Sequence, residues 1–333
     1  MANHTIGKWL RPAIGVILAL PLLAGIGAGY QILAERRAAN RFPAPGQLVD
    51  IGGRRLHVMC SGAGAPGVLI EASGLGTALQ SAAVQRALAI TQRVCSYDRA
   101  GLGWSDSSPD AATAKAMEQD LEQLLARLHL PAPLIFIASS AGGLSVELYA
   151  REHPERVAGL VWVDALSGDV LDRVPEIHRL QRSACLARDA AWMGAIRLIN
   201  PLHLQTADEA VAARAAALTY RRGTLDAVCS MTQAFDASAE QIRRAPNMQS
   251  SIPVVVLIHG EPRDIDPTAS TATLAGLEPK WRAAQEQFSR RFSRSKLLVV
   301  EHSGHLIVSE RPDAVVNAVR EVQRLPAAAN QNL

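Results

Sequence analysis

Short apolar runs alternate with longer amphipathic stretches over most of the chain, and this alternation constrains the fold more than any other feature. Runs of the length of one buried strand lie at residues 68–72, 94–97, 134–138, 157–163, 253–258 and 296–300. Apolar residues with helical spacing lie between or after them, at 112–128, 142–151 and 312–322. The pattern predicts an α/β fold with a mainly parallel sheet covered by helices on both faces.

Two segments depart from the alternation. Residues 48–51 and 55–59 flank a pair of glycines, which is typical of an antiparallel hairpin. Residues 167–251 are rich in Ala and Arg, and they predict several helices inserted as a cap between two strands. We therefore assign 42–166 and 252–325 to the α/β core, 167–251 to the helical cap and 326–333 to a disordered tail.

The N-terminal region contains an uncharged apolar stretch at residues 12–34, flanked by basic residues. Its length suffices to span a bilayer as a helix. Two interpretations stay open: an uncleaved signal anchor, or a cleavable signal peptide with Gly25/Gly27 or Gly27/Gly29 before the cleavage site. Either one makes residues 1–41 a targeting segment and linker. Both predict a protein that is membrane-anchored or exported to the cell envelope, with the side of the membrane left open.

The composition excludes several classes of function. The chain has 34 Lys and Arg against 31 Asp and Glu, a net charge of +3, which is too balanced for a protein whose main partner is nucleic acid. Hydrophobic residues make up 48% of the chain, as in a packed globule. Neither a metal-ligand spacing nor a dinucleotide-binding glycine motif is present. We therefore predict no metal and no cofactor.

The segment ASSAGG, which follows the predicted strand 134–138, indicates a nucleophile on a tight strand-to-helix turn. Such a turn needs small residues two positions before and two after the nucleophile, because backbones approach closely there. Ser140 has Ala138 and Gly142 at these positions, whereas Ser139 would have the bulky Ile137. Ser140 is therefore the candidate nucleophile.

A histidine and a glycine-rich turn supply the other parts of such a site. His305 follows the last predicted strand in the segment Ser-Gly-His, and histidine is the usual base for a hydroxyl near neutral pH. His302 lacks the preceding glycine and is the lesser candidate. In the turn SGLG after residue 72, the backbone N–H of Leu75 can join that of Ala141 in an oxyanion hole.

Five segments together resemble serine hydrolases of the α/β-hydrolase fold, in that family's order. They are VDIGGRRLHVMCSG, LIEASGLG, RVCSYDRAGLGWSD, ASSAGG and SGHLIVSERPDAV. The resemblance implies an eight-stranded, mainly parallel sheet and is greatest to bacterial members with an N-terminal membrane segment and a helical cap. Two positions depart from the family pattern: residues 71–74 replace a His-Gly pair before the oxyanion turn, and Ser139 replaces a histidine.

The resemblance also implies a catalytic acid, but leaves its position open. The family places it after the seventh strand, where this chain has Asp264 or Asp266, or after the sixth, where it has Asp164. We keep Asp264 and Asp164 as equal alternatives, because geometry and not chain order defines a triad.

The resemblance also implies a strand order in which the second strand lies beside the fourth, and these strands carry Cys60 and Cys95, so the two are a candidate disulfide. Cys185 and Cys229 are a second, more speculative pair. Four buried thiols are the alternative to both pairs.

The activity implied is cleavage of an ester or amide in a small molecule, through an acyl-enzyme on Ser140 with His305 as general base. Esters are expected before amides, and a peptidase is an alternative. Acyl transfer by the same triad and a non-catalytic binding protein are two further readings. An epoxide- or halide-cleaving mechanism is disfavoured, because it needs a carboxylate at position 140.

Overall fold

The computed structural model describes residues 6–199, 209–263, 265 and 270–325. Its centre is an eight-stranded sheet with the order β1-β2-β4-β3-β5-β6-β7-β8. The strands are β1 (Gln47–Asp50), β2 (Arg55–Ser61), β3 (Val68–Glu71), β4 (Val94–Tyr97), β5 (Leu134–Ser139), β6 (Val157–Val163), β7 (Val254–His259) and β8 (Ser295–Val300). β1 and β2 are antiparallel to their neighbours, and the six strands from β4 to β8 in this order run parallel.

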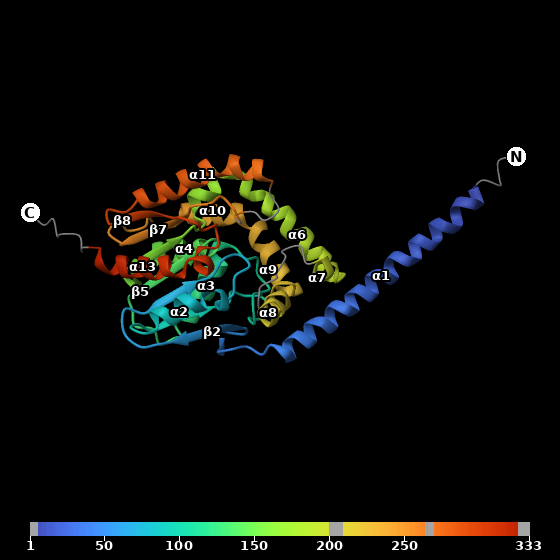
Figure 1. Ribbon diagram of the computed structural model, residues 1–333, viewed down its shortest axis with the longest axis horizontal. Coiled ribbons are helices and arrows are strands. Elements are labelled where there is room, and N and C mark those ends of the chain that lie inside the picture. Colours follow the sequence, from blue (N-terminus) through green and yellow to red (C-terminus); the bar gives the residue numbers. More distant parts are fainter. Residues whose placement is uncertain (1–5, 200–208, 264, 266–269, 326–333) are drawn as a thin grey trace, which may run out of the picture.

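Helices cover both faces of the sheet (Figure 1). The α-helices of the described residues are α1 (Ile6–Arg41), α2 (Ala82–Leu88), α3 (Ala114–Leu125), α4 (Gly142–Glu152), α5 (Gly168–Arg173), α6 (Arg179–Trp192), α7 (Ala195–Ile199), α8 (Glu209–Thr219), α9 (Arg222–Gln233), α10 (Phe235–Arg244), α11 (Thr271–Arg290), α12 (Ile307–Glu310) and α13 (Pro312–Arg324). α3, α4 and α11 pack on one face, and α2 and α13 pack on the other.

The period-two alternation of side chains divides each central strand between two apolar cores. In β5, Phe136 points to the face covered by α3, α4 and α11, whereas Ile135 and Ile137 point to the face covered by α2 and α13. Strands buried on both faces explain the continuous apolar runs in the sequence. The predicted α/β-hydrolase fold is therefore confirmed, and the strands lie within a few residues of their predicted bounds.

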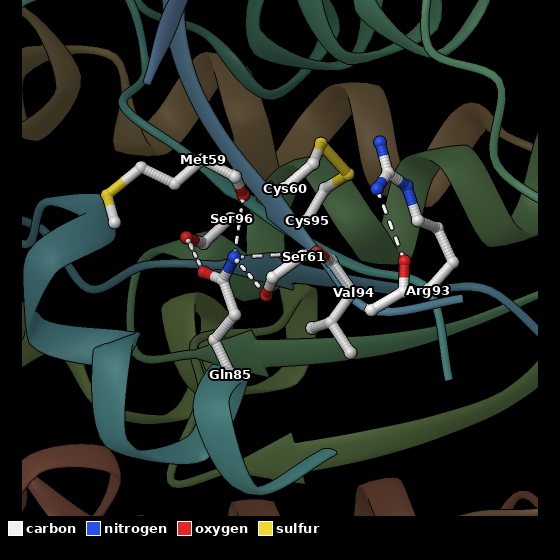
Figure 2. Close-up of a disulfide and its surroundings, with 9 residues drawn as sticks. Met59, Cys60, Ser61, Gln85, Arg93, Val94, Cys95 and Ser96 are labelled. Carbon is white, nitrogen blue, oxygen red and sulfur yellow. Dashed lines mark hydrogen bonds between the residues drawn. A yellow bond between two sulfur atoms is a disulfide. The ribbon is translucent and has the colours of Figure 1, made fainter. Parts of the chain in front are cut away.

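The predicted hairpin forms from β1 and β2, and it brings Cys60 of β2 opposite Cys95 of β4. The two cysteines form a disulfide with a Cα–Cα distance of 4.1 Å (Figure 2). Beside it, the amide of Gln85 donates to the carbonyl oxygen of Met59 and accepts from the hydroxyl of Ser96. The disulfide and Gln85 together fasten the antiparallel edge to the parallel part of the sheet.

The helices α5 to α10 lie between β6 and β7, and we call them the helical insertion. A second disulfide joins Cys185 of α6 to Cys229 of α9 within it, so both candidate pairs form in the structure. Cys229 is fully buried. α6 and α9 are therefore connected both by packing and by a covalent bond.

Replacing Cys185 and Cys229 together by Ala is expected to lower the free energy of unfolding by about 2–4 kcal/mol. The disulfide joins residues 44 positions apart, and without it the unfolded chain gains conformational entropy. Denaturant titration without reductant measures the effect. A reductant should then destabilise the wild type more than the double variant. Equal stability of the two proteins without reductant would contradict the expectation.

The N-terminal apolar stretch forms part of one long helix, α1, and the C-terminal half of α1 packs on the helical insertion. Gln31 is fully buried and donates to the carbonyl oxygen of Tyr220 over 2.7 Å, and Glu35 pairs with Arg222. Among the described residues, no helix has the length and apolar character needed to cross a bilayer. The predicted membrane segment at 12–34 is therefore unsupported. The tail 326–333 lies outside the described residues.

Candidate active site

Ser140 lies on a tight turn between β5 and α4, as predicted. Its φ is +49°, a left-handed conformation that costs free energy in a residue with a side chain. Its N–H donates to the carbonyl oxygen of Val163, which ties the turn to the end of β6. A Cβ on Gly142 would lie 2.5 Å from the side chain of Glu71, so the position two after Ser140 admits only glycine without rearrangement. The turn therefore presents the Ser140 hydroxyl at the carboxyl end of the sheet.

A continuous chain of hydrogen bonds runs from Ser140 through His305 to Asp164. His305 Nε2 lies 2.8 Å from Ser140 Oγ, and its Nδ1 lies 2.7 Å from Asp164 Oδ2. Asp164 directly follows β6, and His305 lies in the loop after β8. Of the sequence candidates for the acid, the structure brings Asp164 to the histidine.

The sequence left three other candidates: Asp264, Asp266 and His302. Asp264 and Asp266 lie outside the described residues. His302 is exposed, at a φ of +59° in the turn before Ser303. His305, in contrast, is buried.

Asp164 is completely buried and has two further donors that the sequence analysis did not name. His259, the last residue of β7, places Nδ1 2.6 Å from Asp164 Oδ2, and Trp281 of α11 donates from Nε1 to Oδ1 over 2.7 Å. Burial alone would raise the pKa of Asp164, but the hydrogen bonds from His259 and His305 hold it well below its usual range. The carboxylate is therefore ionised at every pH at which the protein is expected to work.

Trp281 also positions the histidine, since its ring packs edge-on against His305 with centroids 5.5 Å apart. The sequence contained only a weak signal for these neighbours. His259 ends β7, and Asp164 directly follows the neighbouring strand β6. Because these strands are parallel, their carboxyl ends lie at the same edge of the sheet, which places the two residues together. No comparable signal exists for Trp281, because the sequence analysis did not predict α11.

The oxyanion turn lies beside the nucleophile. The backbone N–H groups of Leu75 and Ala141 donate to no other described residue. Gly74 lies close to Ala141, since a Cβ on Gly74 would be 3.8 Å from the Cβ of Ala141. Two free N–H donors on adjoining turns are what a hole for a developing oxyanion requires.

Arg99 holds this turn in place, which the sequence did not predict. Its guanidinium donates to the carbonyl oxygens of Ala72 and Ser73 over 2.5 Å each and to Glu71 over 3.1 Å. Arg99 also donates to the carbonyl oxygen of Gly74 over 3.4 Å, and the N–H of Leu75 in the same trans peptide therefore points away from Arg99. Burial raises the pKa of Glu71, although Arg99 lies beside it and opposes the rise.

Replacing Arg99 by Met is expected to lower kcat/KM by about tenfold to a hundredfold, because the turn that carries the Leu75 N–H loses its fixed carbonyls, and one oxyanion donor is worth about 10²–10³ in kcat. Ester hydrolysis with a chromogenic substrate measures the change. Arg93→Met is the matched control: Arg93 also donates to a backbone carbonyl, that of Gly62, but at an exposed site. Equal losses in both variants would contradict a role in the turn.

A cavity of about 410 Å³ opens beside the oxyanion turn, between the helical insertion and the core. Ser140 is not among its lining residues, but Gly74 and Met231 are, and a Cβ on Gly74 would lie 3.5 Å from Met231 Cε. The rest of the wall comes mainly from residues 99–112, α3 and α9. The cavity is within the size range of small-molecule sites.

Asp164, His259 and His305 also have ligand atoms of the kinds that bind metals, within 4.8 Å of one another. The sequence analysis predicted no such cluster, because the three residues are far apart in the chain. In the structure Asp164 Oδ2 accepts from both imidazoles, so these atoms already satisfy one another. We therefore treat the cluster as a hydrogen-bond network.

Comparison with known proteins agrees with the fold. Residues 58–318 match the model of the Alpha/beta hydrolase family. An esterase from Thermogutta terrifontis has a TM-score of 0.57 at 22% identity, covering 83% of this chain and 96% of that one. The enol-lactonase from Burkholderia xenovorans has a TM-score of 0.60 at 19% identity, covering 83% of this chain and 99% of that one. The Cif epoxide hydrolase from Acinetobacter nosocomialis has a TM-score of 0.68 at 14% identity, covering 89% of this chain and 96% of that one. At these identities the neighbours show the fold alone.

Among curated proteins, an AB hydrolase superfamily protein of Gibberella zeae is 24% identical over 290 residues, or 78% of this chain and 87% of that protein. A probable transporter of Hormonema carpetanum is 32% identical over 165 residues, or 47% of this chain and 22% of that protein. The chain spans less than a quarter of the length of the first two curated relatives that it matches. These relatives are fungal, so they do not support the special likeness to bacterial members. The family match covers most of the chain, and the chain belongs to the alpha/beta hydrolase family.

Proposed function

We propose that the protein is a serine hydrolase that cleaves an ester through an acyl-enzyme on Ser140. The observation that carries the proposal is the unbroken hydrogen-bond chain from Ser140 Oγ through His305 to Asp164, with distances of 2.8 and 2.7 Å. The left-handed φ of Ser140 supports it, because strain of this kind persists where the surrounding structure enforces it.

In the proposed reaction, His305 is neutral, with its proton on Nδ1 toward Asp164. As Ser140 Oγ bonds to the carbonyl carbon, its proton passes to His305 Nε2. The N–H groups of Leu75 and Ala141 donate to the oxygen that gains the charge. The ester C–O bond then breaks, and the leaving alkoxide takes the proton from Nε2. A water molecule then attacks the carbonyl carbon of the acyl-enzyme and gives its proton to His305. The ester bond to Ser140 breaks, the acid leaves, and Ser140 Oγ takes the proton back from His305.

The cavity supports a small-molecule substrate, since about 410 Å³ adjoins the oxyanion turn. We propose that it takes one side of the ester. Epoxide hydrolases are among the structural neighbours, but opening an epoxide through a covalent ester needs a carboxylate nucleophile, and this chain has Ser140.

Reaction with a fluorophosphonate probe, read as intact mass, tests the proposal. A mass increase of one phosphonyl group, located on Ser140 by peptide mapping, is expected. Loss of labelling after denaturation would distinguish the activated serine from the other serines. p-Nitrophenyl esters of increasing acyl length then measure hydrolysis, and an added alcohol reports acyl transfer as a new ester. A folded protein that neither labels nor hydrolyses any ester would refute the proposal.

We also propose that the protein works in an oxidising compartment, as an exported or cell-envelope protein. All four cysteines form disulfides in the structure, and such bonds persist mainly outside the reducing cytosol. Protein isolated without reductant from the cells that naturally produce it, then denatured and treated with a thiol-alkylating reagent, should show no free cysteine. Four alkylated cysteines would refute this location.

A further inference from the structure

We propose that His259 is a positioning residue of the proposed hydrolase: as an imidazolium it donates to Asp164 and holds that carboxylate in line with His305. The inference rests on the function proposed above for Asp164 and His305. It assigns a role to a buried histidine at the end of β7 that the chain Ser140–His305–Asp164 does not itself include.

Both ring nitrogens of His259 face carboxylates. Nδ1 lies 2.6 Å from Asp164 Oδ2, and Nε2 lies 2.7 Å from Glu278 Oε2. A neutral imidazole has one N–H and one lone pair, so it can donate to only one of these oxygens. Two ionised carboxylates accept hydrogen bonds but donate none. The geometry is therefore satisfied by the doubly protonated ring.

The neighbours of both carboxylates keep them ionised. Asp164 accepts from His305 and Trp281 as well as from His259, so the partners of its carboxylate among the described residues are N–H donors. Glu278 pairs with Arg282, one turn further along α11, and Arg282 also donates to the backbone oxygen of His259 over 2.9 Å. Charges alternate along this path, from Asp164 through His259 and Glu278 to Arg282.

The electrostatics agree with the geometry. Burial opposes the charge on His259, but the hydrogen bonds to Asp164 and Glu278 outweigh it and raise its pKa to about 9. Burial also acts to raise the pKa of Glu278, and its bonds to His259 and Arg282 lower it overall. The charged and titratable groups around the ring are Asp164 from the end of β6, Glu278 and Arg282 from α11, and His305 from the loop after β8.

The arrangement couples the charge of His259 to the proposed catalytic acid. Asp164 Oδ2 accepts from His259 and His305 together, so the position of one imidazole fixes the oxygen that orients the other. Because the folded pKa is raised, the charged form prevails below about pH 9 and is lost as the pH rises through that value. Above that pH His259 is neutral and keeps one N–H, so it can no longer donate to both Asp164 and Glu278. We therefore expect an alkaline fall in kcat/KM with an apparent pKa near 9.

The first experiment reads the protonation of His259 without using activity. Side-chain nitrogen NMR of Ser140→Ala protein, with His259→Asn to assign the signal, is expected to show an imidazolium at pH 7.5 that titrates near pH 9. Glu278→Gln removes one carboxylate partner and should move that titration down by about one pH unit or more. A neutral His259 at pH 7.5 would overturn the proposal, whether or not the protein is a hydrolase.

The second experiment compares pH profiles of kcat/KM for the wild type, His259→Asn, His259→Leu and Glu278→Gln. Asn keeps an N–H donor for Asp164 without titrating, so its profile should lack the alkaline fall. Leu removes the donor and should lower kcat about tenfold or more, with KM changed less than threefold, whereas Asn should recover most of that loss. In Glu278→Gln the alkaline fall should begin at lower pH. No thiol complicates this range, because all four cysteines are in disulfides.

The outcomes separate this inference from the function on which it rests. An active wild type whose alkaline fall is unchanged in all three variants refutes the role of His259 and leaves the hydrolase intact. Equal losses in the Asn and Leu variants refute it too, because a damaged fold would explain both. A wild type that labels with no fluorophosphonate refutes the hydrolase, and the NMR titration then decides the protonation of His259 alone.

Discussion

Ser140→Ala is expected to abolish labelling by a fluorophosphonate and to lower kcat for ester hydrolysis by at least about 10⁴-fold. The reason is that the proposed reaction passes through a bond to Ser140 Oγ, and removal of a triad nucleophile costs about 10⁶ in kcat in subtilisin, where this has been measured. The remaining rate would come from the oxyanion donors and from substrate binding, which the substitution leaves in place.

Ser139→Ala is the matched control for this variant. Ser139 is the last residue of β5 and is buried, but His305 contacts the neighbouring Ser140. Ser139→Ala should therefore label and hydrolyse at rates near those of the wild type. Circular dichroism and thermal unfolding establish that both variants fold. Hydrolysis by folded Ser140→Ala at the wild-type rate would rule out the acyl-enzyme.

Asp164→Asn is expected to produce the second large effect, a fall in kcat of about 10⁴-fold. A neutral amide turns a donor toward His305 or His259, so His305 is no longer held with its proton on Nδ1 and its lone pair toward Ser140. The loss should appear in kcat, because the side chain is fully buried behind His305 and does not contact the cavity. Steady-state kinetics across pH 6–9 measure it.

The comparison with Asp264→Asn decides between the two acids that the sequence left open. Because Asp164 Oδ2 lies 2.7 Å from His305 Nδ1, we expect Asp264→Asn to keep kcat within a few-fold of the wild type. Stability has to be measured beside activity, since Asp164→Asn also takes an acceptor from His259 and Trp281. A 10⁴-fold loss in Asp264→Asn with normal activity in Asp164→Asn would reverse the assignment.

The local parts of the fold and of the site were predictable from the sequence because short-range rules govern them. Strands buried on both faces require continuous apolar runs, so β3 to β7 could be recognised within a few residues. The tight turn at Ser140 requires small neighbours, and a Cβ on Gly142 would indeed meet Glu71. His305 follows the last strand, where chain order alone suggested a base.

The N-terminal stretch shows what such local reasoning leaves out. A run of uncharged residues satisfies a length rule for a membrane helix, but the rule does not include tertiary partners. In the structure Gln31 is buried against Tyr220 and Glu35 pairs with Arg222, contacts between residues nearly 190 positions apart. No pattern within residues 12–34 indicates them.

The sequence by itself determined the α/β class, because that class depends on side-chain periodicity. It also placed Ser140 on a tight turn and His305 after the last strand, because these positions depend on steric limits within a few residues and on chain order. Only the tertiary structure decided which acid faces His305, and that His259, Trp281 and Arg99 support the site. These contacts join β6, β7, α11 and the loops beyond β4 and β8. These segments are distant in the chain, and the hydrogen bonds between them depend on how the parallel strands and α11 pack. The spacing of residues in the sequence does not predict that packing.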